Sequence, residues 1–325
     1  MPTPLSRRGA LAAAALLALG LPGAVLAQAF PAKPLTFVVP FAAGSATDQL
    51  ARALGQSVTE QTKQAVVVEN KAGASGMMAA QAAARAPADG YTVLITTNTT
   101  HAANEHLYKK LPYDAVKDFA PVTGLGKGGQ VMVVNVNSPY KTVADVVAAA
   151  KKSPGKLSFG SGSSSSRMAG EMLKQLSGTD ILHVPYKSNP MGITDLLGGQ
   201  IDFMITDTST GVPQVKAGKL RALGYSTQKR STQLPDVPTI DEAGVKGYDM
   251  GYWFAAYVPA GTPAPVVARL NELLGAAVRS TAARTFFDTA GSEAWTTTPD
   301  ELAKFQTAET LKWGKVIKAA GIEPE

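Results

Sequence analysis

The sequence predicts two α/β domains joined by a hinge that the chain crosses twice, and three observations carry this prediction. Short β-branched runs alternate with longer amphipathic stretches, which is typical of βαβ units and a largely parallel sheet. The chain has 325 residues, and because single hydrophobic cores stop growing at about 250–300 residues, more than one domain is expected. Hydrophobic residues make up 45% of the chain, which allows compact cores and excludes wholesale disorder.

Residues 1–29 are predicted to be an export signal and not a part of the fold. Arg7 and Arg8 supply positive charge, the run from Ala10 to Leu26 is apolar and uncharged, and Ala27-Gln28-Ala29 matches a cleavage site. The run is shorter than the roughly 20 residues that a membrane-spanning helix needs, so a retained anchor is disfavoured. The paired arginines leave both the Sec and the Tat export routes open.

The predicted first domain begins with a strand over residues 35–39. Further strands are expected over 65–69 and 91–96. Helices are expected over 48–61 and over about 77–85, because apolar residues recur there at helical spacing.

A second series of strands and helices predicts the second domain. Strands are expected over 131–136, 156–159, 181–185, 201–206 and 220–226, with helices over 143–151 and 167–176. A strand over 251–258 and helices over 264–279 and 299–320 then return the chain to the first domain. The first domain is therefore predicted at residues 30–131 and 252–325, and the second at residues 132–251.

The most informative pattern is a strand followed by a loop of small residues and then a helix. It occurs at residues 42–48, 73–76, 97–100 and 160–166. In open parallel sheets, ligands bind at the carboxyl ends of the strands. Helix N-termini there present unpaired N–H groups and about half a positive charge, so they attract anions without a basic side chain. Several such loops in each half predict a cleft that binds a carboxylate.

Ordinary strand-to-helix turns, in which Ser, Thr and Asp are N-caps, are the alternative interpretation. Asp48 lies where a helix would start, and capping is its expected role. Asp207 follows the apolar run 201–206, so it could meet a ligand's amino or hydroxyl group, or serve as a cap or in a turn. Tyr252 and Trp253 are expected to pack in the core or the hinge, with a cleft wall as the alternative.

The composition disfavours catalysis, cofactors and metals. The chain has no cysteine, which excludes thiolate chemistry, and its three scattered histidines do not supply a metal site. Ser163 or Ser164 could be a nucleophile, but no histidine and orienting carboxylate are evident for a triad. Residues 124–129 match G-x-G-x-x-G but lead into a strand, so they are interpreted as a flexible crossing segment. The net charge of +6 is too small and too dispersed to indicate nucleic-acid binding.

A series of motifs follows the order known in one family. They include Phe30-Pro31-Ala32-Lys33-Pro34, Glu69-Asn70-Lys71-Ala72-Gly73, His183-Val184-Pro185-Tyr186-Lys187, the run from Asp195 to Asp202, the run from Lys216 to Leu223, and Leu234-Pro235-Asp236-Val237-Pro238-Thr239. With these residues, essentially the whole mature chain resembles the substrate-binding proteins of tripartite tricarboxylate transporters, the Bug or TctC family.

The resemblance implies a periplasmic receptor with two Rossmann-like α/β domains, a two-segment hinge and the type II periplasmic-binding-protein architecture. Such a receptor closes on a small carboxylate like a Venus flytrap and delivers it to integral-membrane transporter subunits. We expect a monomer with no enzyme activity and no cofactor. The predicted ligand-binding residues are Phe41, Ala43, Gly44, Ser45, Ala46, Thr47, Asp48, Thr97, Asn98, Thr99, Ser161, Gly162, Ser163, Ser164, Ser165, Tyr186 and Asp207.

Two positions depart from the family pattern. Residues 43–46 read Ala-Gly-Ser-Ala where the family often has a glycine pair, and Arg167 stands where many members have histidine. Gly44→Val and Gly162→Val are expected to abolish binding by steric exclusion in a protein that still folds. A receptor that presents its ligand to a membrane sensor kinase and a serine-dependent hydrolase are the alternative functions. The carboxylate stays open among aliphatic, citrate-like and aromatic acids and amino acids.

Overall fold

A computed structural model describes residues 30–319 and 321–324 of the chain. The predicted export signal at residues 1–29 therefore lies outside the described residues. Within the part that is described, no helix is both long enough and apolar enough to cross a bilayer.

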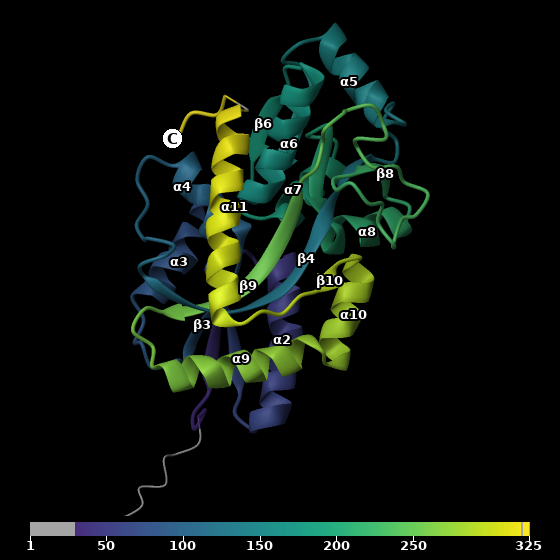
Figure 1. The fold of residues 1–325 in the computed structure, drawn as a ribbon. Coiled ribbons are helices and arrows are strands. Elements are labelled where there is room, and N and C mark those ends of the chain that lie inside the picture. The colour runs from purple at the N-terminus through teal and green to yellow at the C-terminus, as the bar shows by residue number, and fades with distance from the viewer. Residues whose placement is uncertain (1–29, 320, 325) are drawn as a thin grey trace, which may run out of the picture. The chain divides into compact units, whose positions relative to one another are not determined.

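The strands of residues 33–325 form one mixed sheet (Figure 1). Its order is β2-β1-β3-β9-β4-β7-β5-β6, and β8 and β10 each pair with β4. The strands are β1 (Leu35–Val39), β2 (Val66–Asn70), β3 (Thr92–Thr97), β4 (Phe119–Asn135), β5 (Ser158–Ser161), β6 (Leu182–Pro185), β7 (Phe203–Asp207), β8 (Leu220–Tyr225), β9 (Gly251–Pro259) and β10 (Glu293–Ala294). Pairing is parallel around β1 and β5 and antiparallel around β4.

Strand β4 belongs to two parts of the sheet. Residues 119–129 pair with β9, whereas residues 130–135 pair with β7 and β8. We call β1, β2, β3, β9, β10 and the first part of β4 the proximal half, and β5 to β8 with the last part of β4 the distal half. The chain enters the distal half within β4 and returns to the proximal half through the segment that joins β8 to β9. The two domain boundaries stay a prediction.

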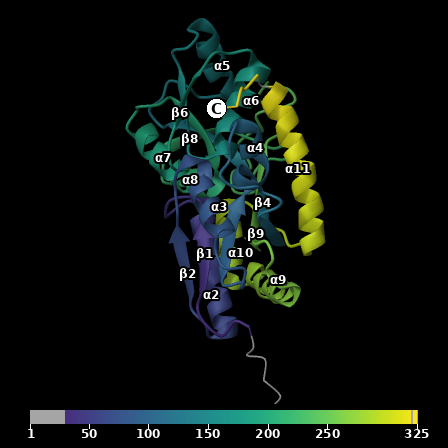
Figure 2. The ribbon, with the colours of Figure 1, turned by 90° about the vertical axis from the view of Figure 1, so that its left-hand side faces the viewer.

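Helices cover the faces of the sheet and connect its strands. They are α2 (Ala46–Thr62), η1 (Ala74–Gly76), α3 (Met77–Ala84), η2 (Thr99–Ala103), α4 (Asn104–Leu107), α5 (Val143–Lys152), α6 (Ser164–Ser177), α7 (Asn189–Leu197), α8 (Thr208–Lys216), α9 (Ala264–Val278), α10 (Thr281–Ala290) and α11 (Pro299–Ala319). Helix α2 packs against α9 and α10, and α11 lies along β4 and η2. Figure 2 shows α11 on the right of the view and β2 on the left of its lower part.

Strand β4 supplies side chains to two hydrophobic cores. Met132 and Val134 belong to a large core, and Val131 and Val133 belong to a smaller one with Met204. Because side chains alternate between the two faces of a strand, both faces of β4 are buried in the distal half. A strand fixed on both faces aligns the ends of its neighbour β7, including Asp207 at the end of that strand.

The predicted flexible crossing segment is wrong, because residues 124–129 lie inside β4. Its glycines are places of close packing. A Cβ atom on Gly126 would lie 2.5 Å from the ring of Phe287, and one on Gly129 would lie 2.6 Å from the ring of Tyr225. Because these glycines have no side chain, aromatic rings can pack directly on the strand. The glycines of the G-x-G-x-x-G match are therefore explained by close packing.

Two helices begin earlier than the sequence predicts, and a third segment is helical where the sequence predicts a loop. Helix α2 begins at Ala46 and α6 at Ser164, because the hydroxyls of Ser45 and Ser163 are their N-caps. The predicted polar loop at residues 97–100 is helical from residue 98 onward. Residues that were expected in loops therefore lie in first turns, where the backbone N–H groups have no partner within the helix.

Candidate functional site

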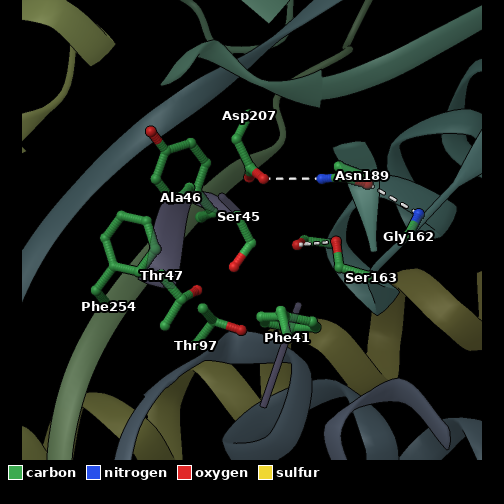
Figure 3. A pocket seen from close by; sticks show the side chains of 12 residues that line it. Phe41, Ser45, Ala46, Thr47, Thr97, Gly162, Ser163, Asn189, Asp207 and Phe254 are labelled. Carbon is green, nitrogen blue, oxygen red and sulfur yellow. Dashed lines mark hydrogen bonds between the residues drawn. The ribbon is translucent and has the colours of Figure 1, made fainter. Parts of the chain in front are cut away.

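A pocket lies where loops and helix ends of the proximal half meet those of the distal half (Figure 3). The proximal half supplies the β1–α2 connection and the ends of β3 and β9. The distal half supplies the starts of α6 and α7 and the end of β7. The lining residues are Phe41, Ser45, Ala46, Thr47, Thr97, Gly162, Ser163, Ser165, Asn189, Asp207, Tyr252 and Phe254. None of these twelve residues is basic.

The pocket is narrow. It encloses about 320 Å³ when space open to solvent is counted, but the centre of a water molecule can occupy only about 10 Å³ of it. This is room for about one water molecule, whereas small-molecule sites usually measure about 300–1,000 Å³. A larger ligand therefore requires the two walls to move apart.

Helices from both halves begin at this pocket, so that their N-termini face it. The Ser45 hydroxyl caps α2 by accepting from the Asp48 amide at 3.3 Å, and the Ser163 hydroxyl caps α6 by accepting from the Ser166 amide at 3.2 Å. Asn189 is the first residue of α7 and lines the same pocket. Each N-terminus contributes partial positive charge, so the pocket attracts an anion without a basic side chain.

Asp48 fixes the loop that leads into α2. Its carboxylate accepts from the Gly44 amide at 2.9 Å and from Asn70 Nδ2 at 3.0 Å, and it pairs with Arg52. Burial alone would raise the pKa of Asp48, but the bonds from Arg52, Gly44 and Asn70 outweigh burial and hold that pKa below its usual value. Asp48 thus supports the loop and does not line the pocket.

Two neighbours of Asp48 in the predicted site also lie outside the lining. Ala43 and Gly44 are exposed, and Gly44 has a φ of +82°, with open space where a Cβ would lie. Its role here is conformational, because glycine adopts positive φ without strain. Phe41, Ser45, Ala46 and Thr47, by contrast, line the pocket.

Only the first residue of the predicted Thr97 loop lines the pocket. Thr97 Oγ1 accepts from the Thr99 amide at 3.1 Å. Asn98 and Thr99 are fully buried, and Asn98 Nδ2 and Thr99 Oγ1 have no hydrogen-bond partner among the described residues. Buried polar atoms that lack a protein partner are usually satisfied by water.

Asn189 links Gly162 to Asp207 across the distal wall (Figure 3). Gly162 N donates to Asn189 Oδ1 at 2.8 Å, and Asn189 Nδ2 donates to Asp207 Oδ2 at 2.8 Å. The backbone N–H can only donate, so it fixes the orientation of the Asn189 amide. Burial raises the pKa of Asp207 to about 6, although the bond from Asn189 opposes that rise.

The remaining predicted residues line a neighbouring pocket, in which the centre of a water molecule can occupy about 130 Å³. Ser161, Ser164 and Tyr186 line it together with Ser163, which belongs to both pockets. Tyr186 donates from its hydroxyl to Asp195 Oδ2 at 2.8 Å, and Ser161 Oγ lies 2.7 Å from His183 Nε2.

Three lining residues were not predicted as ligand-binding residues. Tyr252 and Phe254 come from β9 and point the same way along that strand. Period-two alternation around Tyr252, whose role as a cleft wall was left open, would have found Phe254 too. Asn189 follows strand β6 and begins a helix that has proline near its start. The pattern of a strand, a short polar loop and a helix could therefore have predicted Asn189 as well.

Comparisons with known proteins agree with this fold. The sequence model of the family described as Tripartite tricarboxylate transporter family receptor matches residues 50–322. The solved structure of R. palustris Rpa4515 with adipate has a TM-score of 0.87 at 34% identity, over 91% of this chain and 100% of that one. The periplasmic binding protein BugD has a TM-score of 0.87 at 32% identity, over 91% and 100% of the two chains.

MatC (Rpa3494) from Rhodopseudomonas palustris with bound malate is similar as well. Its TM-score is 0.84 at 30% identity, over 89% of this chain and 100% of that one. Together these similarities confirm the predicted fold class and the predicted family resemblance.

Proposed function

We propose, because the chain belongs to the tripartite tricarboxylate transporter family of receptors, that it is a periplasmic receptor for a small carboxylate. The ligand would bind in the pocket of Figure 3 and be delivered to a membrane transporter. The family and the fold are those of solute-binding receptors, so binding and release take the place of a chemical step.

One observation carries the proposal: helix N-termini from both halves meet at a pocket whose lining has no basic side chain. Such N-termini bind carboxylates through backbone N–H groups and small hydroxyls. Ser45, Thr47 and Thr97 offer hydroxyls from the proximal half, and Ser163 and Ser165 offer them from the distal half. A carboxylate between the halves would contact both and favour their approach.

Water is a second part of the proposed site. Asn98 Nδ2 and Thr99 Oγ1 are buried behind Thr97 without a partner in the described part of the chain. An ordered water there would satisfy them and pass a hydrogen bond on to the ligand. Ala43, Gly44 and Asp48 would act by shaping the α2 N-terminus, and Ser161, Ser164 and Tyr186 by lining the adjoining pocket.

Movement of the two halves gives the ligand access. The pocket holds about one water molecule, so the ligand enters an opened form and the halves then close. β4 and the segment that joins β8 to β9 are the connections that would bend, because they carry the chain between the halves.

Thermal unfolding of the mature protein with a panel of carboxylates tests ligand binding. The panel comprises succinate, malate, adipate, citrate, benzoate and glutamate; adipate and malate are included because they are the ligands named for two similar structures. A member that binds the native state raises the melting temperature with concentration. Absence of a rise for every member would contradict carboxylate binding.

A pair of variants in α2 locates the site. Thr47→Val removes a hydroxyl at the pocket, whereas Thr59→Val removes one that donates to the Gly55 carbonyl oxygen in the same helix. Loss of the ligand-induced rise in Thr47→Val alone supports the placement, and equal loss in both variants contradicts it.

Export and delivery need their own measurements. We expect the protein from the periplasmic fraction to begin directly after Ala29, as N-terminal sequencing would show. We also expect uptake of the labelled ligand to require both this protein and the transporter subunits. Uptake that is unchanged by removal of this protein would contradict the delivery step.

A further inference from the structure

We propose that Asp207 selects ligands that carry a hydroxyl or ammonium group close to a carboxylate. The inference rests on the proposed function and deepens it, because it names the chemistry of the ligand. It starts from a charge imbalance in the lining: Asp207 is its single ionisable carboxyl group, and Lys, Arg and His are absent from it.

Asp207 is placed where an aspartate would ordinarily cap a helix. It ends β7 and is the N-cap residue of α8, yet its side chain makes no capping hydrogen bond to that helix. The carboxylate instead points toward Asn189 and the centre of the pocket (Figure 3). The common structural role of an N-cap aspartate therefore does not account for this residue.

The partners of Asp207 do not balance its charge. Asn189 Nδ2 donates to Asp207 Oδ2 at 2.8 Å, and within residues 30–319 and 321–324 no basic side chain forms an ion pair with Asp207. Asn189 in turn uses its oxygen to accept from the Gly162 amide, so the orientation of this relay is fixed. A partly buried carboxylate with one neutral side-chain partner favours a further donor.

A ligand donor supplies what the protein lacks. The helix N-termini of α2 and α6 attract the ligand carboxylate, and a hydroxyl or ammonium group on the same ligand can donate to Asp207. A plain diacid would instead bring like charges together beside Asp207, which disfavours binding. Because hydrogen bonds to charged groups contribute more than neutral ones, we expect a preference of about 10- to 100-fold for the donor-bearing ligand.

Matched ligands measure this preference by calorimetry at pH 8. Succinate is compared with malate and aspartate, and adipate with 2-aminoadipate, so that each comparison adds only a hydroxyl or an ammonium group. The malate arm and the amino-acid arms separate the two kinds of donor. Wild type is compared with Asp207→Asn, which keeps the shape of the side chain and removes its charge.

The control is Asp202→Asn. Asp202 precedes the same strand, β7, and its carboxylate accepts from the Ser158 amide at 2.8 Å, away from the pocket. This variant removes the same charge from the distal half, and we expect it to keep the wild-type preference.

The expected result is a preference of at least 10-fold in wild type that falls below about 3-fold in Asp207→Asn, with the plain diacid bound at least as tightly. Binding of that diacid shows that the variant is folded. Equal affinities within each matched pair, or a preference that survives in Asp207→Asn, would overturn the inference and leave the proposed function intact. Failure of every carboxylate to bind wild type would overturn both.

Discussion

Ser164 in α6 donates a hydrogen bond to Asn104 in α4, with 2.9 Å between Ser164 Oγ and Asn104 Oδ1. The bond is buried and joins the distal half of the sheet to the helices that follow β3. Asn104 is held in this orientation because its Nδ2 donates to the Ser75 carbonyl oxygen at 3.0 Å and to the Tyr113 hydroxyl at 3.2 Å. The link therefore stabilises the arrangement in which the two halves lie together.

Ser164→Ala is expected to weaken carboxylate binding by about 2- to 10-fold, because one hydrogen bond of the closed arrangement is lost. The closed arrangement is then less populated, and the apparent affinity falls with that population. Calorimetry with the tightest-binding member of the carboxylate panel measures the change. Ser177→Ala is the control, since Ser177 lies in the same helix and donates to the Leu173 carbonyl oxygen. Equal affinities of Ser164→Ala and Ser177→Ala would contradict the role of the link.

The sequence predicts most of the strands because hydrophobic runs and turn residues are local signals. Strand Gly251–Pro259 agrees with its prediction almost to the residue. Residues 124–129 were misread because glycine has two uses, flexibility and close packing, and only tertiary contacts such as Gly126 with Phe287 separate them. Helix α10 was missed although Ser280 caps its start and Gly291 ends it.

The candidate site was predictable in part for the same reason. Residues just before a helix, such as Ser45 and Ser163, carry a local signal as N-caps and do line the pocket. Asp48 and Ser164 have equally polar surroundings in the sequence, but their hydrogen bonds lead to Asn70 and Asn104. Distances between segments far apart in the chain decide this, and a single sequence does not contain them.

Asp48→Asn is expected to lower the free energy of unfolding by about 1–3 kcal/mol. The carboxylate accepts hydrogen bonds at both oxygens, whereas the asparagine side chain would place an NH₂ group, itself a donor, against one of these donors. The pKa of Asp48 is held below its usual 3.8 in the folded state, so its stabilising effect is present above pH 4 and is lost as the pH falls through the folded pKa. Urea unfolding at pH 7 and pH 3 measures this.

The matched control for Asp48→Asn is Glu60→Gln. Glu60 lies in the same helix and accepts from Gln56 at the surface at 3.1 Å, so its loss should change stability by less than about 0.5 kcal/mol. A difference between wild type and Asp48→Asn that is equally large at pH 3 would contradict the assignment to the carboxylate.

Asp207→Asn is expected to stabilise the protein without ligand. Burial raises the pKa of Asp207 from 3.8 to about 6, so the folded state binds this proton more readily than the unfolded state does. The charged carboxylate therefore lowers the free energy of unfolding, with no effect below about pH 4 and the full effect above about pH 6. We expect Asp207→Asn to gain about 1–3 kcal/mol at pH 7.5 and little at pH 4.

Neighbouring ionisable groups do not titrate between about pH 4 and pH 6, where Asp207 does. On α2, Asp48 is paired with Arg52 and titrates below pH 4, and on β9, burial raises the pKa of Tyr252 far above neutrality. Urea unfolding of wild type and Asp207→Asn between pH 4 and pH 8 measures the gain, and a pH-independent difference would contradict it.

Gly126→Ala is expected to lower the free energy of unfolding by about 1–3 kcal/mol, because its Cβ would lie 2.5 Å from the buried ring of Phe287. A flexible segment would respond in the opposite direction, since Gly→Ala then reduces the entropy of the unfolded chain. Gly198→Ala is the control, because the nearest atom to its Cβ is 3.5 Å away. Thermal unfolding distinguishes the two, and a gain in stability for Gly126→Ala would restore the flexible interpretation.

Substitutions at Gly44 and Gly162 are expected to act differently from each other. A Cβ on Gly162 would lie 1.9 Å from the Ser188 backbone, so Gly162→Val should impair folding as well as binding. A Cβ on Gly44 meets open space, but its φ of +82° penalises valine by about 1–2 kcal/mol. Gly44→Val should therefore fold and bind less tightly because the α2 N-terminus shifts, whereas Gly44→Asn, which tolerates positive φ, should keep wild-type affinity. Calorimetry of both Gly44 variants measures this, and equal loss in both would restore steric exclusion as the cause.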